Sequence, residues 1–152
     1  MVTRHHELAS QPRKVLFLDF DGVLHPAGDG IEELKGPAFV WLPLLEDALA
    51  RHSNVGIVVS STWRYTHSQG ELRELLGSIG PRLLGAIPTG PRYEGIRWWL
   101  HLNRSFTSFR ILDDQPLEFA DPPPPELVLC TPSLGLTTPG VLEQLRSWLG
   151  SP

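Results

Sequence analysis

The sequence predicts an α/β protein: a three-layer sandwich with a mainly parallel central sheet and helices on both faces. Short apolar runs such as 15–18 and 55–59 are continuous rather than alternating, which is typical of strands covered on both faces. Segments such as 38–52 and 141–150 instead place apolar residues at helical spacing. Because strands and helices take turns along the chain, we expect the strands to run parallel.

The expected elements follow one another in a regular order. The predicted strands cover residues 14–20, 55–60, 82–88, 109–114 and 126–130, and the predicted helices cover 38–52, about 68–77, 93–102 and 141–150.

Glycine and proline residues mark the breaks between these elements. Residues 22–37 contain four glycines and two prolines, which predicts an irregular loop. Pro43 is tolerated in the first turns of its helix, and Gly150 ends the last helix. The prolines of 122–125 predict an extended connector.

Length and composition indicate one domain. A chain of 152 residues with 41% hydrophobic residues suits a single unit over 1–152, with 1–13 as a loose lead-in. The formal charge of −4 gives no reason to expect a nucleic-acid coat protein or a polybasic membrane binder. Positive charge nevertheless gathers within 61–110, where seven arginines accompany three glutamates, so an anionic ligand could be met there.

Cysteine content and apolar run length suggest a location. Cys130 is the only cysteine, so we expect no intrachain disulfide and a small buried hydrophobe at this position. The first ten residues lack the apolar core of a secretory signal, and no run approaches the ~20 apolar residues of a membrane span. We expect a cytoplasmic protein with no membrane partner. The sequence does not indicate an oligomeric state.

Three of the predicted strands end in polar residues of catalytic type. These residues are Asp19 with Asp21, Ser60 with Ser61, and Asp113 with Asp114. In a parallel α/β sheet, ligands bind beyond the carboxyl ends of the strands, so we expect these residues to share one site. Carboxylates gathered in this way repel one another unless a hard cation with oxygen ligands holds them, and Mg²⁺ fits that description.

Such a site suits phosphoryl transfer. Asp19, at the strand end, could take a phosphoryl group, and Asp21 could protonate the leaving oxygen and later deprotonate water. Ser60 and an arginine could hold the phosphoryl oxygens. Gly22 allows a sharp turn directly after Asp21, where backbone amides could approach an anion.

Four segments, in this order, resemble the motifs of the haloacid dehalogenase-like (HAD) phosphohydrolases, a superfamily with a Rossmann-like fold. They are LDFDGVL, IVVSSTWR, an arginine on the next-to-last helix, and ILDDQP. The resemblance implies a phosphatase with an aspartyl-phosphate intermediate. It makes Asp19 the nucleophile and a Mg²⁺ ligand, and Asp21 the general acid/base that also lends its backbone carbonyl to the metal.

The resemblance also suggests roles for the remaining polar residues. Ser60 corresponds to the phosphate-binding serine, with Ser61 as the fallback. Asp114 is favoured as the metal ligand and Asp113 as its support. The position that most members fill with lysine has none here, so an arginine must serve. Arg92, at the expected helix start and hence at the ligand edge, is better placed than Arg97, more than a turn further on.

The short spacing between motifs resembles the capless branch, which has no sizeable cap domain and whose open sites accept macromolecular or bulky phosphorylated substrates. SSTWR, an arginine-bearing helix with Trp98 and Leu100, ILDD and GLT at 135–137 look like the small HAD domains grouped with RNA-repair proteins. That resemblance points to a nucleotide or a nucleic-acid end as substrate.

Other interpretations of the same residues stay open. A receiver-like or catalytically silent binding domain would also carry paired acids. Trp63 and Arg64 could contact a base or a phosphate, or else Trp63 packs the loop and Arg64 pairs with an acid. His25, just past the glycine, could line the site, although a lone loop histidine is more often a surface or packing residue. Trp98 and Trp99 face different ways on a helix, so at least one belongs to the core.

Overall fold

The computed structural model describes residues 14–27 and 38–152, and within them a parallel sheet of five strands in the order β3-β2-β1-β4-β5. β1 lies at the centre of this order, and its five residues are all buried, as expected for an apolar strand covered on both faces. The strands are β1 (Lys14–Leu18), β2 (Val55–Val59), β3 (Leu83–Ala86), β4 (Ser108–Asp113) and β5 (Leu127–Leu129).

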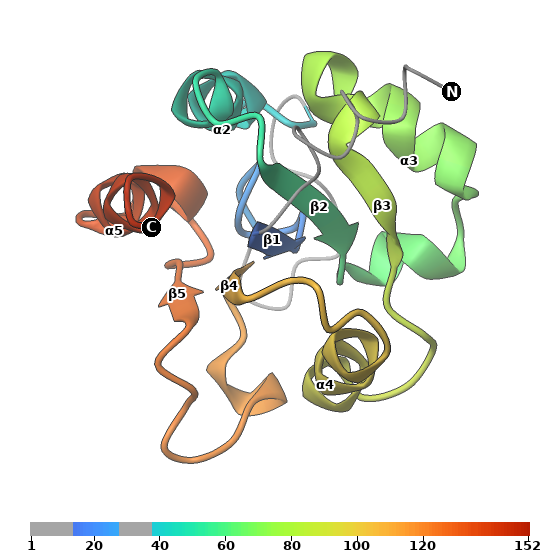
Figure 1. Cartoon of the computed structure of the whole chain (residues 1–152). Coiled ribbons are helices and arrows are strands. Elements are labelled where there is room, and N and C mark those ends of the chain that lie inside the picture. Colours follow the sequence, from blue (N-terminus) through green and yellow to red (C-terminus); the bar gives the residue numbers. More distant parts are fainter. Residues whose placement is uncertain (1–13, 28–37) are drawn as a thin grey trace.

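Helices cover both faces of this sheet (Figure 1). They are α2 (Leu42–Leu49), α3 (Gln69–Leu75), α4 (Arg92–Leu102) and α5 (Val141–Leu149). α2, α3 and α5 pack on one face, and α4 packs on the other. The predicted α/β sandwich with a parallel sheet is therefore confirmed.

Two apolar clusters form the core, one on each face, because successive side chains of a strand point to opposite sides. Leu16 and Leu18 of β1 join the cluster under α2, α3 and α5. Val15 and Phe17 join the cluster under α4, where Trp99 meets Phe17 edge-on at 5.7 Å. This alternation decides which polar residues beyond the strand ends face α4.

Most strands and helices are shorter than the sequence predicts, but α4 begins one residue earlier and β4 keeps its predicted length. β1 ends at Leu18 rather than at residue 20, because the carboxylate of Asp19 accepts a hydrogen bond from the N–H of Phe20 and the chain turns. α2 begins at Leu42, with Pro43 in its first turn as predicted. Ser68 caps α3 through a capping box with Glu71.

Short 3₁₀ helices occupy connections where no element was predicted; the one that matters for the site covers Thr62–Tyr65. No large cap domain is evident in the residues that the structure describes. The predicted lead-in of 1–13 and most of the predicted loop of 22–37 lie outside the described residues.

Cys130 is buried, as expected, and burial raises the pKa of its thiol to about 12. Among the described helices, none has the length and apolar character needed to cross a bilayer.

Candidate active site

The register of the three central strands brings the polar strand ends together. Leu18 of β1 pairs with Val59 of β2 on one side and with Leu112 of β4 on the other. The residues that follow Leu18, Val59 and Leu112 are Asp19, Ser60 and Asp113. These three residues therefore lie side by side at the carboxyl edge of the sheet. The ladder continues past β1, since the N–H of Asp19 donates to Leu112 O at 3.1 Å and that of Ser60 donates to Leu18 O at 3.0 Å.

A buried cluster of three carboxylates lies at this edge. Asp19, Asp113 and Asp114 are each at most 4% exposed, and one oxygen of each lies within 4.8 Å of those of the other two. Burial, and then the charge of Asp113, raise the pKa of Asp19 well above its usual range. Burial also raises the pKa values of Asp113 and Asp114. The cluster is thus costly as three anions and calls for compensating positive charge.

This donor set fits a magnesium ion. Mg²⁺ prefers carboxylate oxygens, and a buried all-oxygen cluster with raised pKa values is an arrangement that a divalent cation stabilises. The two oxygens of Asp113 are occupied by Arg92 Nη1 at 2.8 Å and by the N–H of Gln115 at 2.9 Å. Apart from Asp19 of the same cluster, the described side chains give Asp114 one long contact, from the Gln115 amide at 3.4 Å. Its oxygens are therefore freer to bind a cation.

Gly22 makes room for Asp114. Its φ of 76° lies in the left-handed region that favours glycine, and a Cβ there would stand 2.0 Å from Asp114 Oδ2. The glycine of the predicted motif therefore serves two purposes. It turns the chain after Asp21, and it lets the backbone approach the acid cluster.

Arg92 supplies the only cation that contacts this cluster among the described residues. It is the first residue of α4, it is 8% exposed, and its Nη1 lies 3.5 Å from Asp19 Oδ2 as well as 2.8 Å from Asp113 Oδ2. Burial alone would lower the pKa of Arg92, but the two carboxylates outweigh that effect and raise it. Arg97 lies elsewhere, on the exposed side of α4, with its guanidinium 5.7 Å from the ring centre of Tyr93.

Asp21 stands apart from the three buried acids. Its carboxylate is 47% exposed, and its Oδ1 lies 2.6 Å from Nε2 of His25. Trp63 Nε1 donates to both of its oxygens, at 3.3 and 3.2 Å. The hydrogen bond from His25 lowers the pKa of Asp21, and the bond from Trp63 adds to that effect. Two carboxylates that the sequence places two residues apart therefore have opposite environments.

The two serines after β2 also differ. The hydroxyl of Ser60 is fully buried and is the one buried side-chain polar atom without a hydrogen-bond partner in the described part of the chain. Ser61 Oγ accepts a hydrogen bond from the N–H of Trp63 at 3.2 Å and so caps the helix Thr62–Tyr65. Ser60 is free to bind a ligand, whereas Ser61 already has a structural partner.

Arg64 forms contacts other than the acid pairing considered for it, and its contact with a ligand stays a prediction. Its guanidinium donates to the carbonyl oxygens of Ser60, Ser61, Pro88 and Gly90. It therefore ties the loop after β2 to the loop after β3. The expected pairing with an acid is wrong, because no acid lies within ion-pair distance of Arg64 among the described residues.

A comparison with protein families gives one match. The family model described as the HAD domain in Swiss Army Knife RNA repair proteins matches residues 15–141. The chain belongs to this family. Searches of curated proteins and of solved structures found no match.

Membership confirms the predicted family and indicates the general chemistry of a HAD-type phosphohydrolase. The matched range contains the strand end with Asp19 and Asp21, the serines, Arg92 and the paired acids. The roles assigned to these individual residues stay predictions.

His25 is a residue of this HAD domain to which sequence reasoning assigned no definite role. Its side chain is completely buried, so a surface position is wrong, and besides packing it bonds to Asp21. A sequence signal did exist, because His25 follows Asp21 by four residues across a glycine turn. The N–H of Gly22 donates to His25 O at 2.9 Å and closes that turn.

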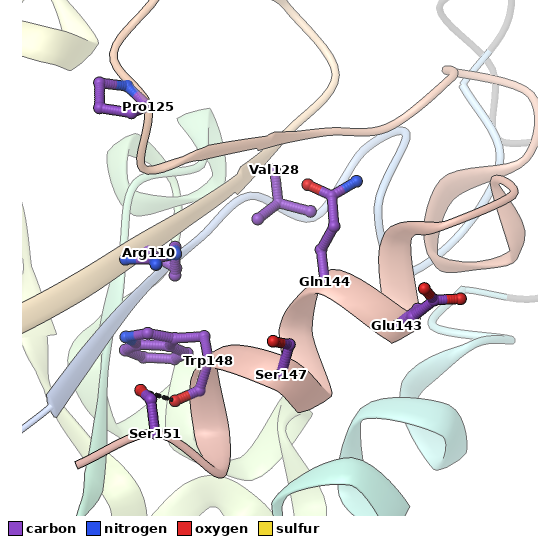
Figure 2. A pocket seen from close by; sticks show the side chains of 8 residues that line it. All are labelled: Arg110, Pro125, Val128, Glu143, Gln144, Ser147, Trp148 and Ser151. Atoms are coloured by element: carbon purple, nitrogen blue, oxygen red, sulfur yellow. Dashed lines mark hydrogen bonds between the residues drawn. The ribbon is translucent and has the colours of Figure 1, made fainter.

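A second hollow of the HAD domain lies away from this site (Figure 2). It has a volume of about 400 Å³ between α5 and the strands β4 and β5, and it is lined by Arg110, Pro125, Val128, Glu143, Gln144, Ser147, Trp148 and Ser151. Trp148 Nε1 donates to Ser108 Oγ at the start of β4, which places the hollow toward the amino ends of the strands. None of the predicted site residues lines it.

Proposed function

We propose that this HAD domain is a Mg²⁺-dependent phosphohydrolase that cleaves a phosphomonoester through an aspartyl-phosphate on Asp19. One observation carries the proposal. The buried carboxylates of Asp19, Asp113 and Asp114 are packed together, with a buried arginine on one side. Burying a charge costs several kcal/mol unless it is paired, so a cluster of this kind is expected where a cation and a phosphoryl group bind.

The arrangement disfavours the alternative of a silent or receiver-like domain. A domain that needs no chemistry gains nothing from the fully buried hydroxyl of Ser60, which has no hydrogen-bond partner among the described residues and follows the strand paired with that of Asp19. In a receiver domain the phosphate-accepting aspartate ends a later strand, whereas Asp19 follows the first described strand. Arg92, rather than a lysine, accompanies the acids.

The two aspartates of the first motif divide the reaction between them. An oxygen of Asp19 attacks phosphorus and the bond from phosphorus to the ester oxygen breaks, while Asp21 gives its proton to that oxygen. Water then attacks the phosphoryl group, Asp21 takes its proton, and inorganic phosphate leaves Asp19. Asp21 suits this role because it is half-exposed and lies outside the acid cluster.

Three further groups of this chain support the transfer. When bound by Asp19, Asp114 and the backbone carbonyl of Asp21, with Asp113 in support, Mg²⁺ would neutralise charge on the phosphoryl oxygens. Ser60 Oγ has a proton to donate to one of these oxygens. Arg92 already spans Asp113 and Asp19 and can hold another oxygen with its remaining N–H groups.

The surface of α4 supports a nucleic-acid end as substrate. Trp98 is 54% exposed and stands between two hollows of about 280 and 460 Å³. Pro88 and Pro91 line the first, and Arg97 and His101 line the second. Trp98 lies six residues after Arg92, which is about 9 Å along a helix and about 120° around it. A single strand that passes around this end of α4 would stack a base on Trp98 while its terminal phosphate reaches Asp19.

Phosphate release from a panel of substrates tests the proposal. The panel contains nucleotides, oligonucleotides with 3′- or 5′-phosphate, sugar phosphates and phosphopeptides, each with Mg²⁺ or with EDTA. Asp19→Asn is the inactive variant. Asp47→Asn is the matched control. Asp47 lies on α2, is exposed, and forms an ion pair with Arg146 of α5.

We expect activity that disappears in EDTA and in Asp19→Asn, and that persists in Asp47→Asn. The largest kcat/KM is expected for an oligonucleotide end. No release from any substrate by the folded protein would instead support a silent or signalling domain.

We also propose a cytoplasmic location, which fractionation of cells that produce the tagged protein would test.

A further inference from the structure

His25 and Trp63 form a clamp on the carboxylate of Asp21; Trp63 belongs to the segment IVVSSTWR, whereas His25 lies outside the four predicted motifs. His25 Nε2 lies 2.6 Å from Oδ1, and Trp63 Nε1 lies 3.3 Å from Oδ1 and 3.2 Å from Oδ2. The short contact is thus to Oδ1 alone. Oδ2 has only the shared and longer bond from the indole.

The tautomer of His25 follows from its second nitrogen. The backbone N–H of Phe39 points at Nδ1 from 3.2 Å. A backbone N–H can only donate, so Nδ1 is the acceptor and carries no proton. The ring proton therefore resides on Nε2, and His25 donates to Asp21 as a neutral imidazole. The contact is a hydrogen bond from a neutral donor rather than an ion pair.

The His25 ring has little freedom to move. It is completely buried, it stacks on Phe39 with ring centres 5.5 Å apart, and it meets Trp63 at 5.7 Å. Trp63 in turn packs on Phe20 and Phe39 at 5.5 and 5.3 Å. Packed aromatic neighbours and a backbone donor hold the imidazole in one orientation, so its N–H direction is fixed before any substrate arrives.

We propose that His25 is the positioning residue of the general acid/base: its Nε2–H holds Oδ1 of Asp21, so that proton transfer falls to Oδ2. This inference rests on the proposed function. An oxygen that accepts a 2.6 Å hydrogen bond from a fixed donor is a poor place for a second proton, so the other oxygen exchanges it. As the bond from phosphorus to the ester oxygen breaks, Oδ2 passes a proton to the leaving oxygen, and it later takes one from the attacking water.

This role predicts a dependence on the leaving group. An alcohol or a phenol with a high pKa must receive a proton as it leaves, whereas p-nitrophenolate leaves readily without one. Loss of His25 therefore harms the first class of substrate more than the second. Partial unfolding or a lost Mg²⁺ site would harm both classes by the same factor.

The experiment compares kcat/KM for phenyl phosphate and for p-nitrophenyl phosphate, because this constant reports the step in which the leaving group departs. The variants are His25→Leu, which removes the donor, and His25→Gln, whose amide N–H can replace Nε2–H. Trp63→Phe keeps an aromatic ring but removes the indole N–H. His52→Leu, a histidine outside the site, is the matched control.

We expect His25→Leu to lose about 10- to 100-fold on phenyl phosphate and less than about 3-fold on p-nitrophenyl phosphate. His25→Gln should recover most of the loss, and Trp63→Phe should show a smaller loss in the same direction because its bonds are longer. The thermal shift produced by Mg²⁺ serves as the check that each variant is folded. His52→Leu should match the wild type on both substrates.

Two failures can be told apart. Equal losses on both substrates in His25→Leu, without recovery in His25→Gln, would overturn the positioning role and leave the phosphatase intact. A wild-type protein that hydrolyses neither ester in Mg²⁺, although folded, would overturn the proposed function and this inference with it.

Discussion

At the scale of single residues, Ser60 and Ser61 show how adjacent, chemically identical side chains acquire different tasks. The hydroxyl of Ser61 is used as a helix cap, whereas that of Ser60 is buried with no partner. A buried hydroxyl without a hydrogen bond destabilises the free protein, so its presence favours a function in binding. For this reason we propose Ser60, rather than Ser61, for the phosphate-binding role.

Substitution of the two serines should separate these roles. Ser60→Ala is expected to lower kcat/KM by about 100-fold, in the range found for removal of one oxyanion donor. Its free energy of unfolding should stay the same or rise, because an unsatisfied group is removed. Ser61→Ala should instead lose about 1 kcal/mol of stability with its cap. Steady-state kinetics and urea unfolding measure the two effects, and a large stability loss in Ser60→Ala would contradict this assignment.

At the scale of secondary structure, α4 places one arginine in the site and another on the surface. Arg92 is the first residue of the helix and contacts Asp19 and Asp113, while Arg97 lies more than a turn further on and is exposed. α4 follows β3 in a parallel sheet, so it starts at the carboxyl edge and leads away from it. Position along the helix therefore decides which arginine can reach a phosphoryl group at Asp19.

Alanine substitutions on this helix test that distinction. Arg92→Ala should reduce kcat/KM for p-nitrophenyl phosphate by about 100-fold or more, because a charged group that contacts the transferring oxygens is lost. Arg97→Ala should leave the same constant within about 2-fold, since surface substitutions have small effects. Equal losses in the two variants would contradict the placement of Arg92. Circular dichroism of both variants controls for loss of α4.

Trp98 allows a test of the substrate class at the same scale. If a base stacks on its exposed ring, Trp98→Ala should raise KM for a phosphorylated oligonucleotide by about 5- to 100-fold, equivalent to about 1–3 kcal/mol of stacking. Trp98→Phe should retain much of the affinity. Neither variant should change kinetics on p-nitrophenyl phosphate, which has no base to stack. An unchanged KM on the oligonucleotide in Trp98→Ala would remove this support for a nucleic-acid substrate.

At the scale of the whole molecule, the acid cluster makes stability depend on pH and on Mg²⁺. The pKa of Asp19 is raised in the folded protein, chiefly by burial. Its contribution to stability is therefore fully present below the unfolded pKa, near 4, and is lost as the pH rises through the folded value. Without divalent cations, the ionised carboxylate of Asp19 therefore destabilises the folded protein at neutral pH. A bound cation offsets this destabilisation.

Asp19→Asn should consequently unfold at the same or a higher temperature than the wild type in EDTA at pH 7–8, because Arg92 keeps Asp113 as a partner. The difference should shrink toward pH 4. Mg²⁺ at 100 times its Kd should raise the wild-type unfolding temperature by about 5–10 °C, from about 2.7 kcal/mol of binding. The variant should show little or none of this shift. Scanning calorimetry with and without Mg²⁺ measures each quantity, and a variant that is less stable in EDTA across this pH range would contradict the account.

The sequence by itself determined the α/β class, the order of strands and helices, the family, and the edge of the sheet where the acids gather. Continuous apolar runs report burial on both faces, and a polar residue at the end of such a run marks where a strand leaves the core. For that reason Asp19, Ser60 and the pair Asp113 and Asp114 can be selected from residue order alone. The predicted ends of the strands and helices were less accurate, because local hydrogen bonds such as that of Asp19 with the N–H of Phe20 decide where a strand stops.

Only the tertiary structure decided what each side chain contacts. The tie between Arg64 and the loop after β3, and the contact of Arg92 with Asp113, join residues more than twenty positions apart. His25 became a partner of Asp21 because Gly22, with its left-handed φ, turns the chain back on itself. The direction of a side chain after such a turn depends on backbone torsion and on distant packing, and neither follows from residue spacing along the chain.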